Sequence, residues 1–503
     1  MRRRCFSLGL LGAIASFALD EHTPQAQIQP LVSPVAGSVP AVPIGAPTLA
    51  SSSPLPREWA LAKANALQTW VAAHKGALSL EVVDLRDGRS AQIQAQQAVN
   101  PASNMKLITA AVALDVLGVD HVFRTALYGK VDAQGAVDQL VLRGNGDPNL
   151  VDADLWRLAN TLRQRGVVQV NSLLVDQTAF DDHFVPPAFE QQPNEWSSFR
   201  APVSAIAVAR NSVTLNVLPQ AANTDARVWF EPSGIVTTQG QVKTTGAGLG
   251  QNVQLTLTQA PNGGLLATLA GHIAPGAGRQ RFTKRVDDPR LVPGLVLAQA
   301  LRDNGITVAT VQSGVVRDLP LVTYITSAPL SQILPALGKQ SDNFTAEMVF
   351  KSLSSSSHGT ASSEASANLV TQWLSHRFAL PPGTQVRNGS GLFDANRIAA
   401  TTLVALLKDA YADPSRRDAM LHQLAIGGLD GTLVRRFTQA KLRGKIRAKT
   451  GTLDDTVALS GYVLRDGTEP PVVFSILVSG ISGHHGELRP LVDAVVTEIA
   501  GAN

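Results

Sequence analysis

Cysteine is almost absent from the chain, and neither sign of charge dominates. Cys5 is the single cysteine among 503 residues, and it lies in an apolar segment near the N-terminus. If that segment is removed on export, the remaining chain has neither a structural disulfide nor a catalytic thiol. Lysine and arginine number 43 against 39 aspartates and glutamates, and loss of Arg2, Arg3 and Arg4 lowers the formal net charge from +4 to +1. This balance gives no electrostatic reason to expect nucleic-acid binding.

Long hydrophobic runs are also scarce. The apolar run from Cys5 to Leu19 is shorter than the roughly 20 residues that a membrane-spanning helix needs. It follows three arginines and contains the small-residue sequence Ser16-Phe17-Ala18, so we predict a cleaved secretory signal over residues 1–18. Residues 19–56 are rich in proline, alanine and serine. They are expected to form either an extended linker, which would space the folded part from a membrane surface, or a featureless tail.

Hydrophobic periodicity outlines the folded part, which begins near Arg57. Apolar residues between 60 and 71 have helical spacing, and residues 78–95 read as two strands joined by a turn. From about residue 123, short strands separated by glycine-rich turns predominate, with a helix at 152–164. This stretch is too long for a loop and predicts one or two inserted domains. The chain ends with a hairpin and an amphipathic helix over residues 458–499.

A serine and a lysine lie one helical turn apart at Ser103 and Lys106. Pro101 suits the first turn of a helix, and apolar residues continue with helical spacing from Leu107 until Gly118. Residues three apart share a helix face, so the hydroxyl and the amine are expected to project into the same space. If burial or a second cation lowers the pKa of the lysine, its amine can act as a base toward the serine. Because this spacing alone is usually accidental, the hypothesis depends on two further motifs.

The second motif is Ser341-Asp342-Asn343, which precedes a helical segment. A hydroxyl and an amide on one short loop can relay a proton to a leaving group and orient a substrate amide. The same spacing recurs at Ser366-Ala367-Asn368, within a serine- and alanine-rich helical segment. We interpret this second copy as a coincidence.

The third motif is Lys449-Thr450-Gly451-Thr452, at the start of a predicted strand. Glycine in a strand allows another backbone or a ligand to approach closely. Lys449 could bind a substrate carboxylate, and its charge would favour the neutral form of Lys106. Taken alone, the motif is more readily interpreted as an ordinary basic strand edge.

The sequence contains no pattern typical of a metal or nucleotide site. His484 and His485 are adjacent and lack a partner four residues away, which favours a capping or surface role over metal binding. Gly144-x-Gly146 lacks the third glycine of a dinucleotide site, so we interpret it as a tight turn. No metal and no organic cofactor are therefore expected.

The order SxxK, SxN and KTG, at Ser103, Ser341 and Lys449, is typical of penicillin-recognising serine enzymes. Longer blocks resemble the class C penicillin-binding proteins, the D-alanyl-D-alanine carboxypeptidases/endopeptidases of type 4, and so does the long insertion between the first two motifs. The blocks are Asn100 to Thr109, Leu114 to Gly118, Gly146 to Pro148, Arg200 to Ala205, Asn388 to Leu392, Gly428 to Thr432, Arg447 to Leu453 and Leu459 to Val463.

The resemblance implies an α+β fold in which helices cover an antiparallel sheet. Residues 57–122 and 318–503 would form this transpeptidase-like catalytic domain. Residues 123–317 would form the large, mostly β inserted region, as one or two subdomains. Peptidoglycan stem peptides ending in D-Ala-D-Ala, and D-Ala cross-links, are the implied periplasmic substrates, with β-lactams as dead-end mimics. Peripheral membrane association and the oligomeric state stay open.

The resemblance also implies a role for each motif residue. Ser103 would be the acylated nucleophile and Lys106 its base, and the backbone N–H groups of Ser103 and Thr452 would form the oxyanion hole. Ser341 would relay a proton to the leaving D-alanine, and Lys449 would hold the terminal carboxylate or support the relay. The remaining substrate-binding positions are Asn343, Asp342, Thr450 and Gly451.

One block departs from the family pattern, because Asn388 stands where an aspartate usually precedes Gly-Ser-Gly-Leu. This leaves a local salt bridge or substrate contact in question. Two other functions are compatible with the sequence. A β-lactamase or esterase on the same fold would need an efficient deacylating base. Glu364 resembles the glutamate element of one β-lactamase class only faintly, and it lies in the wrong sequence context. A non-catalytic peptidoglycan-binding protein would have no need of intact motifs.

Overall fold

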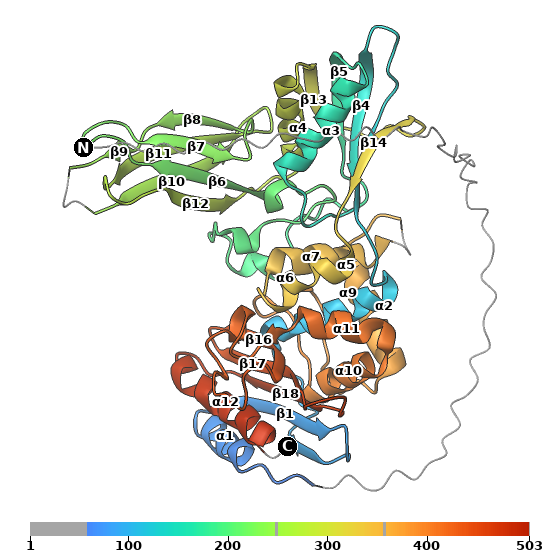
Figure 1. The fold of residues 1–503 in the computed structure, drawn as a ribbon, viewed down its shortest axis with the longest axis vertical. Helices are drawn as coiled ribbons and strands as arrows, with labels where there is room; N and C mark the ends of the chain where they lie inside the picture. Colours follow the sequence, from blue (N-terminus) through green and yellow to red (C-terminus); the bar gives the residue numbers. More distant parts are fainter. Residues whose placement is uncertain (1–57, 247–249, 356–358, 502–503) are drawn as a thin grey trace, which may run out of the picture. The chain divides into compact units, whose positions relative to one another are not determined.

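A six-stranded antiparallel sheet unites the two ends of the folded chain. The computed structural model describes residues 58–246, 250–355 and 359–501, so the predicted signal segment and linker lie outside the described residues. The strands are β1 (Ala77–Asp84), β2 (Ser90–Ile93), β15 (Ala425–Ile426), β16 (Ile446–Leu453), β17 (Thr456–Val463) and β18 (Val472–Ser479). Their order is β15-β16-β17-β18-β1-β2, so the N-terminal hairpin completes a sheet made of C-terminal strands (Figure 1).

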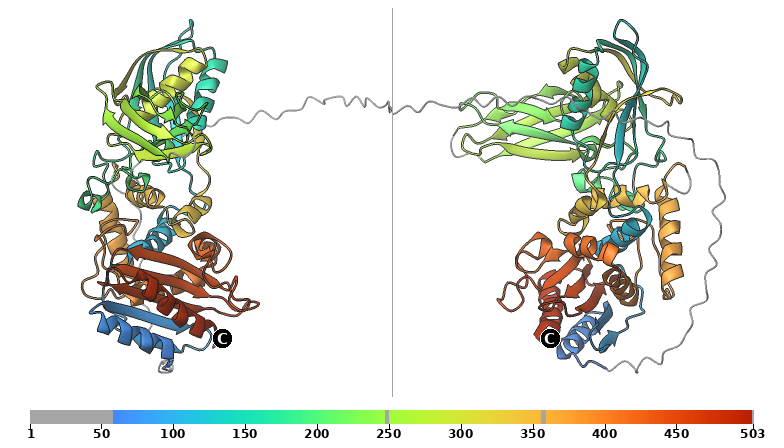
Figure 2. Two further views of the ribbon diagram at one scale, coloured as in Figure 1. Left: turned by 90° about the vertical axis from the view of Figure 1, so that its left-hand side faces the viewer. Right: turned by 45° about the vertical axis from the view of Figure 1, so that its right-hand side comes forward.

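Helices cover both faces of this sheet. In β18, Phe474, Ile476 and Val478 belong to a hydrophobic cluster with helices α1 (Ala62–Ala73) and α12 (His485–Gly501). The alternate residues Val473 and Leu477 belong to a second cluster with α2 (Met105–Val116) and α10 (Ala400–Ala412). Both faces of β18 are therefore buried, which explains its continuous apolar sequence. Figure 2 shows the blue N-terminal segment against the red C-terminal one in both views.

Helix α2 lies in the middle of the second cluster. Every residue from Met105 to Leu114 is buried, as expected for a helix that is apolar on all sides. The predicted helix ending near Gly118 is confirmed, although a short 3-10 turn, η1 (Ala102–Asn104), precedes it. The helices around α2 are α5 (Leu330–Ile333), α6 (Pro335–Gly338), α7 (Asn343–Ser352), α9 (Ser363–Arg377) and α11 (Pro414–Gln423).

The long insertion begins and ends in a second, five-stranded sheet. Its strands are β3 (Arg124–Tyr128), β4 (Ala136–Gly144), β5 (Gln169–Asp176), β13 (Thr307–Ser313) and β14 (Leu321–Thr326), in the order β13-β5-β4-β3-β14. β4, β5 and β13 run parallel and are connected through α3 (Asp152–Gln164) and α4 (Val292–Asp303). Both helices pack on one face of the sheet. β14 pairs with β3, so this sheet extends past residue 317, where we expect the insertion to end.

Two smaller sheets complete the insertion. One has the order β12-β6-β7, and in the other β11 lies between β10 and β8 and also pairs with β9. Leu215 and Val217 of the first sheet share a hydrophobic cluster with Ala267 and Leu269 of the second. The strands are β6 (Ser212–Leu218), β7 (Arg227–Glu231), β8 (Val236–Gly240), β9 (Lys243–Thr244), β10 (Asn252–Gln259), β11 (Leu265–Ile273) and β12 (Gln280–Arg285). The predicted α+β fold with a mostly β insertion is confirmed.

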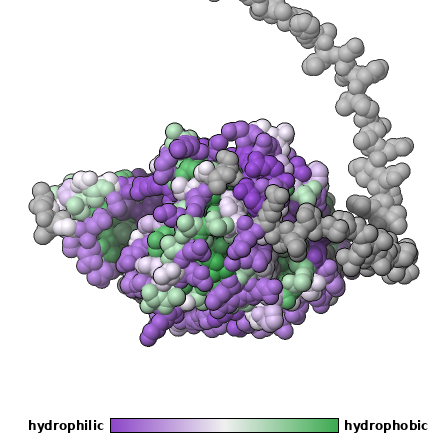
Figure 3. Space-filling model, turned by 90° about the horizontal axis from the view of Figure 1, so that it is seen from below, coloured by the Kyte–Doolittle hydropathy of each residue, from purple (hydrophilic) through white to green (hydrophobic). Residues whose placement is uncertain are grey.

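Within the described residues, no helix is long and apolar enough to cross a membrane. Seen from below, from the end where α1 and β1 lie in Figure 1, the surface is mainly hydrophilic, with hydrophobic side chains in small groups (Figure 3). Helix α10 ends at Ala412, and Pro414 then begins α11. Proline suits the first turn of a helix because its missing N–H has no partner there.

One buried hydrogen bond ties the sheet to its covering helix. The Tyr462 hydroxyl donates to the Leu407 carbonyl of α10 at 2.8 Å, and its side chain is fully buried. Tyr462→Phe should therefore lower the free energy of unfolding by about 1 kcal/mol, as measured by urea denaturation. Tyr411→Phe is the matched control, because the Tyr411 hydroxyl makes no hydrogen bond to a described residue. Equal losses in both variants would contradict this account.

Candidate active site

The turn η1 holds Ser103 between two sheet strands and the loop that follows α9. Ala102 has a positive φ of 45°, and its N–H donates to Asn100 Oδ1 at 2.9 Å. The Asn104 amide accepts from Ser460 Oγ at 2.7 Å and donates to the Lys449 carbonyl at 2.9 Å. A left-handed alanine is strained and persists only where its surroundings fix it. These bonds therefore set the position of the Ser103 hydroxyl, which stays partly exposed.

Two glycines allow η1 to approach its neighbours. A Cβ on Gly451 of β16 would lie 3.0 Å from the Pro101 carbonyl oxygen and from Ala102 Cβ. A Cβ on Gly391, whose φ is +73°, would lie 1.9 Å from the Ala102 carbonyl oxygen. The close backbone approach expected at Gly451 is confirmed, and Gly391 is a position that only glycine fits.

Lys106 lies behind Ser103 and is fully buried. Its Nζ is 3.0 Å from Ser103 Oγ, 2.8 Å from Asn343 Oδ1 and 2.6 Å from the Ser390 carbonyl oxygen. Burial lowers the pKa of Lys106 to about 7, although the charges of Glu347 and Asp342 oppose that shift. At neutral pH a large share of this amine is unprotonated, so it can accept the proton of the Ser103 hydroxyl.

Lys449 and Ser341 form the opposite side of the site. Lys449 is also fully buried, and its Nζ donates to Ser341 Oγ at 2.8 Å and to the Thr450 carbonyl at 2.7 Å. Burial, followed by repulsion from Lys106, holds the pKa of Lys449 well below its usual range. We expected Lys449 to lower the pKa of Lys106, but burial is the main cause there and the like-charge effect falls on Lys449. Ser341 has a positive φ of 57°, a second strained residue at the site.

The other predicted binding residues have different surroundings. Asp342 caps α7 by accepting from Thr345 N at 2.7 Å, and it pairs with Arg210. Its carboxylate therefore has a structural role in holding the loop of Ser341 and Asn343. Thr450 Oγ1 lies 2.9 Å from Thr432 Oγ1. Thr452 is exposed and lines a cavity of about 670 Å³ together with residues that include Asn100, Leu392, Asp394 and Arg397.

The second SxN copy lies outside this site. Ser366 is fully buried in α9, and its hydroxyl contacts Ser354 Oγ at 3.0 Å and the Lys351 carbonyl at 3.1 Å. Its hydrogen bonds are thus used in packing α9 against α7. The interpretation of this copy as a coincidence is confirmed.

Glu347 is a site residue that the sequence analysis missed. It lies one turn after Asn343 in α7, is nearly fully buried, and accepts from Gly389 N at 3.2 Å and Ser390 N at 2.7 Å. Burial raises the pKa of Glu347, and these hydrogen bonds and the charge of Lys106 oppose the rise. The carboxylate thus fixes the loop whose Ser390 carbonyl accepts from Lys106. An Asn-x-x-x-Glu spacing on one helix face was the available signal.

Both the nitrogen and the oxygen of the Asn388 side-chain amide are hydrogen-bonded within the protein. Its Nδ2 donates to the Pro187 carbonyl at 3.0 Å and the Leu392 carbonyl at 3.2 Å. Its Oδ1 accepts from Gly391 N at 3.0 Å and Asn396 Nδ2 at 2.8 Å. The side chain is fully buried and presents no surface to a substrate. In this chain, therefore, position 388 makes structural hydrogen bonds that an ionised aspartate cannot reproduce.

His484 and His74 are close in space although far apart in the sequence. The His484 carbonyl accepts from Glu487 N and Leu488 N at the start of α12, which agrees with the predicted capping role. Ligand atoms of His74, His484 and Glu487 lie within 4.8 Å of one another. The prediction of no metal cluster used sequence spacing, which cannot detect such a distant histidine.

We predict that Asn388→Asp destabilises the fold. At pH 8 the new carboxylate would face two carbonyl oxygens without a donor, at a cost of about 2 kcal/mol in unfolding free energy. At pH 5 the loss should be smaller, because a protonated aspartate can donate to one of them. Chemical denaturation at both pH values tests this, with Asn396→Asp as a comparison that keeps the Pro187 and Leu392 contacts. A stability equal to wild type at pH 8 would contradict the prediction.

Comparison with known proteins identifies one family. The model of the D-Ala-D-Ala carboxypeptidase 3 (S13) family matches residues 66–496. A D-alanyl-D-alanine carboxypeptidase from Actinomadura sp. (strain R39) is 33% identical over 404 residues, which cover 76% of this chain and 74% of that protein. The D-alanyl-D-alanine carboxypeptidase DacB from Haemophilus influenzae is 24% identical over 413 residues, which cover 76% of this chain and 80% of that protein.

A solved structure has the same fold. The crystal structure of penicillin binding protein 4 from Haemophilus influenzae matches with a TM-score of 0.71 and 21% identity, covering 85% of this chain and 98% of that chain. Its complex with a β-lactam matches with a TM-score of 0.67. The chain belongs to the D-Ala-D-Ala carboxypeptidase 3 (S13) family and is, with the type-4 class C penicillin-binding proteins, a serine-type D-alanyl-D-alanine carboxypeptidase.

Proposed function

We propose that this carboxypeptidase acts in the periplasm through an acyl-enzyme on Ser103, that it also cleaves D-Ala cross-links as an endopeptidase, and that β-lactams inhibit it. The observation that carries the proposal is the pair of hydrogen bonds from the two buried lysines. Lys106 Nζ reaches Ser103 Oγ at 3.0 Å, and Lys449 Nζ reaches Ser341 Oγ at 2.8 Å. Each hydroxyl thus has an amine with a lowered pKa beside it.

Acylation follows from this arrangement. Lys106 takes the proton of the Ser103 hydroxyl as Oγ attacks the carbonyl carbon of the penultimate D-alanine. The backbone N–H groups of Ser103 and Thr452 then stabilise the negative charge on the tetrahedral oxygen. The C–N bond breaks as Ser341 gives a proton to the leaving amine, and the proton that Lys106 took from Ser103 replaces it by way of Lys449, so that both lysines end the step as they began it.

Deacylation and binding use the same groups. Water attacks the ester on Ser103 while Lys106 accepts a proton from the water. Lys106 then gives this proton to Ser103 Oγ as the ester C–O bond breaks, so the enzyme returns to its starting state. Asn343 is fixed by Lys106 through its Oδ1 and keeps its Nδ2 for the substrate peptide. Thr450 and Gly451 lie on the edge of β16 beyond its pairing with β15, where an extended peptide can add as a further strand.

Endopeptidase action requires room for a larger leaving group. The cavity of about 670 Å³ next to Thr452 could accept a second peptide stem in place of free D-alanine.

Among the described residues, Lys106 is the one titratable side chain hydrogen-bonded to Ser103. In the described part of the chain no carboxylate is hydrogen-bonded to Ser103, which favours a stable penicilloyl enzyme over a β-lactamase.

Intact-mass analysis after incubation with a labelled penicillin tests the nucleophile. We expect one adduct, mapped to the peptide containing Ser103, and an acyl-enzyme that persists for minutes or longer. Ser103→Ala should take up no label, whereas Ser366→Ala, the matched control in the second SxN copy, should be labelled like wild type. Rapid turnover of the drug would indicate a β-lactamase, and a folded wild-type protein without any adduct would indicate a non-catalytic protein.

The pH dependence of acylation tests the base. Because Lys106 must be neutral to act and its pKa is about 7, the second-order rate of acylation should rise with pH and level off above that value. At pH 6 it should be about tenfold below the plateau, since one pH unit below a pKa leaves about a tenth of the amine free. Stopped-flow acylation measures this, with circular dichroism as a check on folding. A rate that is flat between pH 6 and 8 would exclude Lys106 as the base.

A further inference from the structure

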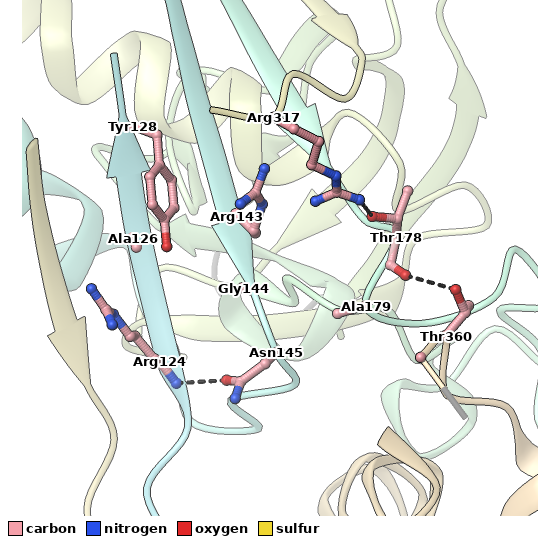
Figure 4. A pocket seen from close by; sticks show the side chains of 11 residues that line it. Arg124, Ala126, Tyr128, Arg143, Gly144, Asn145, Thr178, Ala179, Arg317 and Thr360 are labelled. Atoms are coloured by element: carbon pink, nitrogen blue, oxygen red, sulfur yellow. Dashed lines mark hydrogen bonds between the residues drawn. The ribbon is translucent and has the colours of Figure 1, made fainter. Parts of the chain in front are cut away.

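A cavity on the inserted five-stranded sheet is rich in arginine. Arg124, Ala126 and Tyr128 occupy alternate positions on β3, and Arg143 of β4 pairs with Ala126. These residues lie on the face opposite α3 and α4, because Leu127 and Leu142 point to the helices. Figure 4 shows Tyr128 and Arg143 side by side, with Arg317 reaching in from the segment between β13 and β14. The cavity measures about 450 Å³, and none of the three catalytic motifs contributes to its lining.

Positive charge in this cavity exceeds negative charge. Its lining includes three arginines and no carboxylate. The nearest acid, Asp176, is fully buried beneath, where its Oδ2 accepts from Arg143 Nε at 2.7 Å and from Arg317 Nη1 at 3.3 Å. Its Oδ1 accepts from Thr178 N and Oγ1 at 3.0 and 2.6 Å. Asp176 is therefore fully used, and it pairs with two of the three guanidinium groups.

Arg124 has no acidic partner among the described residues, and its Nε is buried without a hydrogen bond. The other two arginines also keep unused donors, because neither Arg143 Nη1 nor Arg317 Nε makes a hydrogen bond to a described residue. A buried guanidinium donor without a partner costs free energy, which a bound acceptor would recover.

Aromatic stacking orients two of these guanidinium groups in advance. Arg124 lies 4.1 Å above the centre of the Tyr324 ring, and Arg143 lies 4.7 Å above that of Tyr128. Stacked arginines lose little further freedom when a ligand binds. Asn145 adds another donor, since its Oδ1 already accepts from Arg124 N at 2.6 Å and leaves its Nδ2 free. The oxygens of Asp176 and Asn145 are thus occupied, whereas several donors of the arginines and of Asn145 are free.

We propose that this cavity is a binding site for a carboxylate of a peptidoglycan stem peptide that is not being cleaved. The planar donor forks of arginine match a carboxylate. The cavity is larger than an inorganic ion requires, and its wall includes Ala126, Ala179 and the Tyr128 ring, which suit the apolar stem of a peptide side chain. The site would hold the polymeric wall while Ser103 acts elsewhere on it, and this role rests on the proposed function.

Binding to isolated, insoluble peptidoglycan tests the site. In a Ser103→Ala background, which prevents cleavage, we expect Arg124→Gln and Arg317→Gln each to weaken sedimentation with peptidoglycan about tenfold, the effect of losing one charged hydrogen bond of some 1.4 kcal/mol. Arg163→Gln, an exposed arginine of α3 outside the cavity, is the matched control and should bind as before. Amidation of the peptidoglycan carboxylates should remove the difference among the three variants.

Other results would overturn the proposal. Equal binding by all variants would exclude the cavity as a wall-binding site. A difference that survives amidation and disappears when inorganic phosphate is added would identify a phosphate site instead. Labelled penicillin should acylate Arg124→Gln and Arg317→Gln at the wild-type rate when Ser103 is present. If Arg124→Gln fails to fold, Arg317→Gln decides, because its side chain is 57% exposed. Failure of wild type to take up penicillin would reject the proposed function separately.

Discussion

The burial of the Lys106 amine is the constraint on which the site depends. An ammonium group without water is costly, so the lysine either loses its proton or gains strong acceptors. Here it does both in part, because its pKa falls to about 7 while Ser103, Asn343 and Ser390 surround it. Each of these acceptors comes from a different part of the chain. The fold is therefore what allows the amine to lose its proton at neutral pH.

The motif chemistry was predictable because it depends on short spacings. Ser103 and Lys106 are one turn apart on a helix, and the helical spacing of the apolar residues that follow them predicts that helix from the sequence. Helix α3 at Asp152–Gln164 matches its predicted bounds, since it begins with acidic residues and has a clear apolar face. The order of the three motifs then indicated the family, and with it the fold class.

The supporting groups were not predictable, because each depends on contacts between distant segments. Glu347 acts on a loop more than 40 residues later through two backbone N–H groups. Arg210, from the insertion, pairs with Asp342 and so reaches the loop that holds Ser341. Asn388 differs from the family pattern, and only its four hydrogen bonds explain why an amide fits there. Strands such as β14 were missed because half-exposed edge strands have weak apolar patterns.

The insertion contacts helix α7, which carries residues that fix the Lys106 amine and its neighbouring loop. Phe180 pairs with Ala361 in an isolated bridge, and both belong to a buried cluster with Phe344 and Met348 of α7. Helix α7 begins at Asn343 and carries Glu347, so the residues that position Lys106 share a helix with those that bind the insertion. Packed interiors resist small displacements. Loop segments of the insertion thus stabilise the helix that carries Asn343 and Glu347, so the mostly β insertion supports the candidate site although it supplies none of the three motifs.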